Sequence, residues 1–191
     1  MKILWLNNQG LSFMEIMVSI SIIIVVLSLT VVNYKGANKR TEIIIWADKL
    51  VSDIRLMENN ALAVKTFNDD STRNLWGIYF NTSNAETTGH YVLYNDENGN
   101  QIFDSGETYR DIILPNHIIV EKVEGEYAAN TFEPITECSV ALIPPDPAIK
   151  IINHDNFNRS YSQIIITLLD TINGSTKTVT INFFGLVEVV S

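Results

Sequence analysis

One stretch of sequence decides the fold of this chain, residues 10–32, which read GLSFMEIMVSISIIIVVLSLTVV. From Leu11 to Val32 the residues are apolar or small, and Glu15 is the single charge among them. A helix of this length rises about 33 Å, which matches the roughly 30 Å hydrocarbon core of a bilayer. We therefore predict a membrane-spanning helix over residues 11–34.

The carboxylate of Glu15 needs an explanation, because a charge buried in lipid costs several kcal/mol unless it finds a partner. Cleavage after Gly10 would supply one, since the new α-amine of Leu11 would be a cation that pairs with Glu15 of a neighbouring, axially shifted copy. Alternatively, Glu15 snorkels to the interface of an ordinary signal anchor. The residues alone favour neither reading.

The segment from Gln9 to Val18 resembles the processing site of type IV prepilins and type II secretion pseudopilins. That family has Gly before the cut and Glu at the fifth mature position, here Gly10 and Glu15. The resemblance implies cleavage between Gly10 and Leu11 by a prepilin peptidase, N-methylation of Leu11, and assembly into a helical filament. Leu11 stands where most members have Phe.

Two other observations bear on this segment. A secretory signal peptide would have an apolar region of about 7–15 residues and a small-x-small cleavage site, and this run is longer. Lys35, Lys39 and Arg40 follow the run while only Lys2 precedes it, so loop charge by itself places the C-terminal side in the cytoplasm. The leader pattern implies the opposite orientation, and we follow the leader.

Beyond the apolar run, residues at steps of three and four predict an amphipathic helix over residues 35–66. The apolar stripe consists of Ile43, Trp46, Leu50, Ile54, Met57, Ala61 and Val64. The opposite face carries Asp48, Lys49, Ser52, Asp53, Arg55 and Glu58. The stripe is expected to cover a sheet of the same chain.

After residue 67 the pattern changes to short segments rich in β-branched and aromatic residues, separated by turn residues. They are residues 76–80, 90–94, 110–114, 118–123, 139–142, 163–169 and 178–183. Asn173-Gly174 predicts a hairpin turn between the last two. The predicted fold class is α+β, with a long N-terminal helix, membrane-spanning in its first half and amphipathic in its second, packed on a C-terminal antiparallel β-sheet domain. The predicted boundaries are a leader at 1–10, helices at 11–34 and 35–66, and the β domain at 67–191.

This layout resembles the H-type minor pseudopilins, the GspH/FimT-like family, over nearly the whole chain. The resemblance rests on residues 47–61 in the helix, on residues 94–107, and on residues 179–187 near the end. Leu186 stands where relatives often carry a basic residue, which argues against transferring the DNA binding that some members use during DNA uptake.

The segment Asp96 to Glu107 reads DENGNQIFDSGE and places oxygen ligands at the spacing of an EF-hand calcium loop. The candidate ligands are Asp96, Asn98, Asn100, Ile102 through its backbone carbonyl, Asp104 and Glu107. Position 6 of such a loop is Gly, and here it is Gln101. Gly99 and Gly106 also fit turns between two strands without any metal. Calcium is therefore the one cofactor that we consider.

Charge and composition limit the function. The formal net charge of −9 repels nucleic acid phosphates in the absence of a basic patch. Cys138 is the single cysteine, so an intrachain disulfide is excluded. His90, His117 and His154 are far apart in sequence, and we find no nucleophile elbow or phosphate loop. We do not expect an enzyme.

The expected function is that of a minor pseudopilin or minor pilin, a structural subunit of a type II secretion pseudopilus or type IV pilus. The expected partners are a prepilin peptidase, other pilins, a platform protein, a motor ATPase and the membrane. The expected location is the inner membrane as a single-pass protein, with the β domain extracytoplasmic, and then the filament. Two alternatives remain: a pilus subunit whose β domain binds DNA or a surface ligand, and a calcium-stabilised anchored domain that never polymerises.

Overall fold

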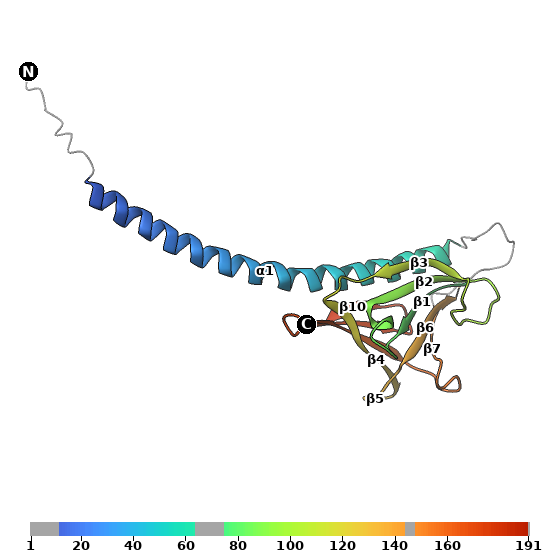
Figure 1. The fold of residues 1–191 in the computed structure, drawn as a ribbon. Helices are drawn as coiled ribbons and strands as arrows, with labels where there is room; N and C mark the ends of the chain where they lie inside the picture. Colours follow the sequence, from blue (N-terminus) through green and yellow to red (C-terminus); the bar gives the residue numbers. More distant parts are fainter. Residues whose placement is uncertain (1–11, 64–74, 144–147, 191) are drawn as a thin grey trace, which may run out of the picture. The chain divides into compact units, whose positions relative to one another are not determined.

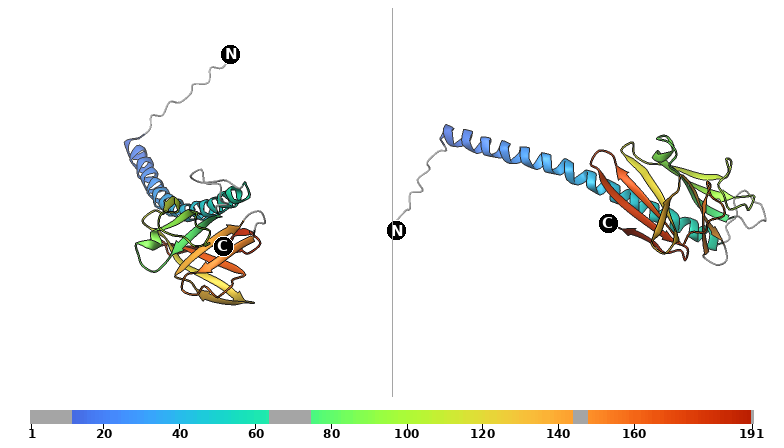
Figure 2. Two further views of the ribbon diagram at one scale, coloured as in Figure 1. Left: turned by 90° about the vertical axis from the view of Figure 1, so that its right-hand side faces the viewer. Right: turned by 90° about the horizontal axis from the view of Figure 1, so that it is seen from below.

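The computed structural model describes residues 12–63, 75–143 and 148–190 of the chain, without the side chains of residues 30–40 and 148. The chain divides into two compact units, Met1–Lys39 and Arg40–Ser191, and each is described by itself. One helix, α1 (Phe13–Leu62), contributes residues to both units. The two further views in Figure 2 show the strands gathered in the second unit.

The first unit is helical from Phe13, and every side chain described in it is exposed. Apolar side chains lie on all sides of residues 13–29, so this helical segment has no polar face and no distinct apolar face that would pack on a single neighbour.

The predicted membrane span is corrected by the structure. Within the described part of the chain, no helix is both long enough and apolar enough to cross a membrane. The transmembrane segment and the single-pass inner-membrane location are therefore wrong for the described residues.

The second unit begins with the amphipathic part of α1, which lies along the strands (Figure 1). Burial recurs here at steps of three and four, as the sequence predicts. The buried apolar side chains are Ile43, Ala47, Leu50, Val51, Ile54, Met57 and Ala61, and Trp46 packs against them. One expectation fails: Asp53, assigned to the polar face, is only 6% exposed.

The first sheet has the strand order β3-β2-β1-β6-β7 and is antiparallel throughout. Its strands are β1 (Leu75–Asn81), β2 (His90–Asp96), β3 (Thr108–Ile113), β6 (Glu137–Ile143) and β7 (Ala148–Asn153). A short 3-10 helix, η1 (Thr87–Gly89), precedes β2.

The second sheet has the order β10-β9-β8-β4-β5 and is also antiparallel. Its strands are β4 (Ile118–Ala128), β5 (Thr131–Pro134), β8 (Gln163–Asp170), β9 (Ser175–Asn182) and β10 (Val187–Val190). The predicted hairpin turn lies between β8 and β9, where Gly174 adopts a positive φ of 64°. That conformation suits glycine because it has no Cβ.

One hydrophobic core joins the helix and both sheets. It contains Leu50 of α1, Trp76 of the first sheet and Ile166 of the second, all buried. Full burial of each such side chain contributes about 1.5–3 kcal/mol.

The predicted fold class is thus corrected in a second respect, the number of sheets. The described strands form two five-stranded sheets and not one, and among the described side chains of α1 those that pack on the strands belong to the second unit. The physical reason is that the alternation of apolar and polar residues along a strand shows which face is buried, but does not show which helix or sheet covers that face.

Candidate functional site

The exposed apolar helix of the first unit is the first candidate site. Phe13 is 76% exposed, Leu29 is 63% exposed, and the large apolar side chains between them are at least 44% exposed. Each described serine beyond the first turn satisfies its hydroxyl within the helix: Ser19 donates to the Glu15 carbonyl at 2.8 Å, Ser21 to Met17 at 2.8 Å and Ser28 to Val25 at 2.7 Å. Such bonds leave no hydroxyl in need of water. The surface is therefore suited to a dry, apolar surrounding.

Glu15 is the exception on this surface. It lies in the first turn of α1, where a carboxylate interacts favourably with the helix dipole. Among the described residues its carboxylate has no ion-pair or hydrogen-bond partner. Gly10 and Leu11, the predicted cleavage and methylation positions, lie outside the described residues, so their relation to Glu15 stays a prediction.

The loop between β2 and β3 is the second candidate site and holds the residues predicted to bind calcium. Asp96 accepts hydrogen bonds from the backbone N–H groups of Gly99 at 2.7 Å and Gln101 at 2.6 Å. Glu107 accepts from the backbone of Glu97 and Asp104, each at 3.1 Å. These bonds fold the twelve-residue segment into a closed loop around its two terminal acids.

The remaining candidate ligands face one another within this loop. The side-chain amides of Asn98 and Asn100 both donate to Asp104 Oδ2 at 2.8 Å. The amide oxygen of Asn100 accepts from the N–H of Ile102 at 2.8 Å. Among the described residues, no three His, Cys, Asp or Glu side chains converge into a metal site.

The electrostatics and backbone of the loop bear on whether a cation fits there. Burial raises the pKa of Glu107, and the nearby charge of Asp96 raises it further, so a cation between these acids would relieve their repulsion. Gln101 has a φ of 70°, the left-handed conformation that glycine supplies at position 6 of an EF-hand loop. The backbone at this one position thus has the expected conformation although the residue does not match. Calcium binding by Asp96, Asn98, Asn100, Ile102, Asp104 and Glu107 stays a prediction.

A polar cluster that the sequence analysis missed holds this loop to the first sheet. The Ser139 hydroxyl lies 2.8 Å from His154 Nε2, and the backbone N–H of Phe103 donates to the same hydroxyl at 3.1 Å. His154 Nδ1 lies 3.5 Å from Glu137 Oε2. Burial lowers the pKa of His154. No spacing signal reveals this cluster, because its members come from β6, from the residue after β7 and from the loop.

A serine, a histidine and a glutamate that contact one another in this order also form the catalytic triad of some hydrolases. A nucleophilic role of Ser139 therefore has to be considered. Ser139 is fully buried, and its hydroxyl oxygen is occupied by the Phe103 N–H. A substrate carbonyl has no path to that oxygen in this arrangement. We therefore assign the cluster a structural role.

The other two histidines lie elsewhere. His90 Nδ1 is 2.7 Å from Asp111 Oδ1 on the neighbouring strand, and His117 Nε2 is 3.2 Å from Glu42 Oε2 of α1.

Comparison with known proteins found no match: no family model, no curated protein and no solved structure matches this chain. The structure defines the class as a helix packed on two antiparallel sheets, preceded by an exposed apolar helical segment. The function therefore rests on the residues and geometry described above.

Proposed function

We propose that this protein is a structural subunit of a pilus-like filament, a minor pseudopilin or minor pilin. In this role the apolar part of α1 packs among equivalent helices of neighbouring subunits, and the two-sheet unit faces outward. Glu15 pairs with the α-amine that cleavage creates on Leu11 of an adjacent copy.

The observation that carries the proposal is the surface of residues 12–29. A helix that is apolar on all sides needs a partner on all sides, since water cannot solvate it favourably. Equivalent helices in a filament core supply that partner. One unpaired carboxylate on such a surface then gives each helix a single preferred axial position.

The partners follow from this assembly and from the resemblance of residues 9–18 to prepilin processing sites. We expect a prepilin peptidase to remove residues 1–10, and other pilins, a platform protein and a motor ATPase to take part in assembly.

Glu15→Ala tests the proposal in cells that express a prepilin peptidase and assemble filaments. We expect mass spectrometry to find the mature N-terminus at Leu11 in the unchanged protein and in the variant. Filament incorporation of the variant should fall at least about tenfold, which corresponds to about 1.4 kcal/mol. Glu15→Gln should fail similarly, because it keeps the size and removes the charge.

Ser19→Ala is the matched control one turn further along, and it should assemble like the unchanged protein because its hydroxyl bonds only to its own helix. Normal incorporation of Glu15→Ala would contradict the role of Glu15. An intact 1–10 extension in assembled filaments would contradict the whole proposal.

A further inference from the structure

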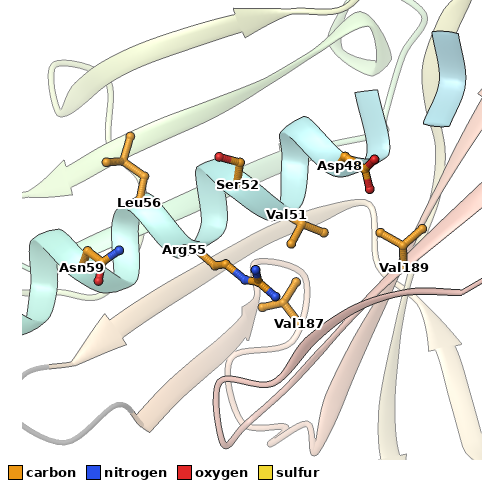
Figure 3. Close-up of a pocket in the computed structure, with 8 residues that line it drawn as sticks. All are labelled: Asp48, Val51, Ser52, Arg55, Leu56, Asn59, Val187 and Val189. Atoms are coloured by element: carbon orange, nitrogen blue, oxygen red, sulfur yellow. The ribbon is translucent and has the colours of Figure 1, made fainter. Parts of the chain in front are cut away.

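A groove runs between the amphipathic part of α1 and strand β10, with a volume of about 550 Å³. Val187 and Val189 of β10 form one wall, and helix residues including Asp48, Val51, Arg55 and Leu56 form the other (Figure 3). Leu56 and Val189 are each 37% exposed. The groove therefore combines accessible apolar surface with charged side chains.

β10 is an edge strand of the second sheet, because it pairs with β9 on one side and with none of the described strands on the other. The register places Val187 opposite Ile181, and the N–H of Asn182 donates to the carbonyl of Leu186 at 3.1 Å. Hydrogen-bonded pairs alternate along an antiparallel ladder. The N–H and C=O groups of Val187 and Val189 therefore point away from β9.

These outward groups lie on the same two residues that line the groove. Within the described part of the chain, none of them has a hydrogen-bond partner. They recur at about 6.8 Å, the two-residue repeat of a strand. An extended polypeptide backbone presents complementary groups at the same repeat.

Two charged residues on the helix wall, Asp48 and Arg55, determine which extended polypeptide segments fit the groove. Neither Asp48 nor Arg55 forms an ion pair with another described residue. They are seven positions apart, which separates them by about 10 Å along the helix. Residues four positions apart in a strand lie on the same face at about 13 Å, within reach of both charges for long side chains. In Figure 3, Asp48 lies beside Val189 and Arg55 extends toward Val187.

We propose that this groove binds an extended segment of another polypeptide, which adds to β10 as a sixth strand of the second sheet. The segment runs antiparallel to β10, with a basic residue near Asp48 at its N-terminal end and an acidic residue near Arg55 at its C-terminal end. An apolar residue midway between these two charged residues, and so on the same face of the strand, covers Leu56 and Val189. The backbone supplies affinity and the charge order supplies specificity, as in strand addition generally.

The test uses the full chain and a fluorescently labelled peptide, acetyl-Lys-Thr-Val-Thr-Glu-amide, in a fluorescence anisotropy titration. We expect saturable binding that weakens at least about tenfold when alternate backbone amides of the peptide are N-methylated, because those amides can no longer donate. The peptide Glu-Thr-Val-Thr-Lys has the same composition and the opposite charge order, and it should also bind more weakly.

Two protein variants complete the test. Val189→Pro removes an outward N–H and should abolish binding. Arg55→Glu leaves the strand untouched, and it should weaken binding of the first peptide and strengthen binding of the reversed one. Asn116→Ala, outside the groove, is the control. Absence of binding, or equal binding of the N-methylated peptide, would show that β10 is a solvated edge and overturn the proposal.

Discussion

Asp53 is the residue at which the amphipathic helix departs from a simple apolar stripe. Its Oδ2 accepts hydrogen bonds from the Tyr91 hydroxyl at 2.6 Å and from Lys49 Nζ at 2.7 Å. Burial and the neighbouring carboxylate raise the pKa of Tyr91, so its hydroxyl stays a proton donor. Lys49 belongs to α1 as Asp53 does, so it is the Tyr91 bond that links the helix to β2 of the first sheet, while Lys49 balances the charge of the buried carboxylate.

Tyr91→Phe tests this contact, because it keeps the buried ring and removes the hydroxyl. We expect the free energy of unfolding to fall by about 1–3 kcal/mol, since the buried carboxylate of Asp53 loses a donor. Urea denaturation of the two proteins measures the difference. Tyr127→Phe, at a side chain that is 40% exposed, should change stability by less than about 0.5 kcal/mol, and an equal loss in both variants would contradict the assignment.

His154 makes the stability of the second unit depend on pH. Burial lowers its pKa below the ordinary value of 6.5, so the unfolded state binds the proton more readily than the folded state. Its stabilising contribution is complete above about pH 6.5 and is lost as the pH falls through the lowered folded pKa.

The measurement compares the unchanged protein with His154→Gln in urea at several pH values between about 7.5 and 5. The stability difference between them should shrink as the pH falls. Burial raises the pKa of Glu58 and Glu107 and so acts in the opposite direction, but both groups are present in both proteins and cancel. His90→Gln is the control, and a pH-independent difference for His154→Gln would contradict the prediction.

At the scale of elements, the β2–β3 loop carries the calcium prediction. Calcium should raise the melting temperature of the full chain, since a ligand that binds the folded state stabilises it by about 2.7 kcal/mol at a hundred times its Kd. Asp96→Asn and Glu107→Gln should abolish the calcium-dependent shift, whatever their effect on the calcium-free protein.

Gln101→Gly is the matched variant in the same loop. Glycine adopts the left-handed conformation of this position without strain, so the variant should bind calcium more tightly. The absence of any shift at calcium concentrations of about 10⁻³ M, the weak end of the EF-hand range, would contradict calcium binding.

The strands show which elements sequence patterns reveal. The longer apolar segments were predictable: β1, β2, β4, β6 and β8 contain theirs in full. β3 ends at Ile113 and β9 at Asn182, one residue before the predicted ends at 114 and 183. β5, β7 and β10 are absent from the prediction. β5 and β10 have only four residues each, which is too short for alternation to stand out, and all three strands are sheet edges whose pairing depends on a distant neighbour.

At the scale of the whole molecule, Cys138 reports on the integrity of the core. It is fully buried on β6, and burial raises the pKa of its thiol. Because it is the single cysteine of the chain, a thiol reagent should label the native protein very slowly and the urea-unfolded protein at once. Leu50→Ala, which should cost about 2–5 kcal/mol, should speed native-state labelling; rapid labelling of the unchanged protein would contradict the described core.

The amino-acid sequence by itself determined the apolar surface around Glu15, the stripe of the amphipathic helix and the faces of the longer strands, because these follow from the local periods of helix and strand. Only the tertiary structure decided that the strands divide into two sheets, that Asp53 is buried under Tyr91, and that Ser139, held by His154, binds the β2–β3 loop. It also placed the free edge of β10 beside α1. Such features join residues that are distant in sequence, and which surfaces meet depends on the packing of the whole chain.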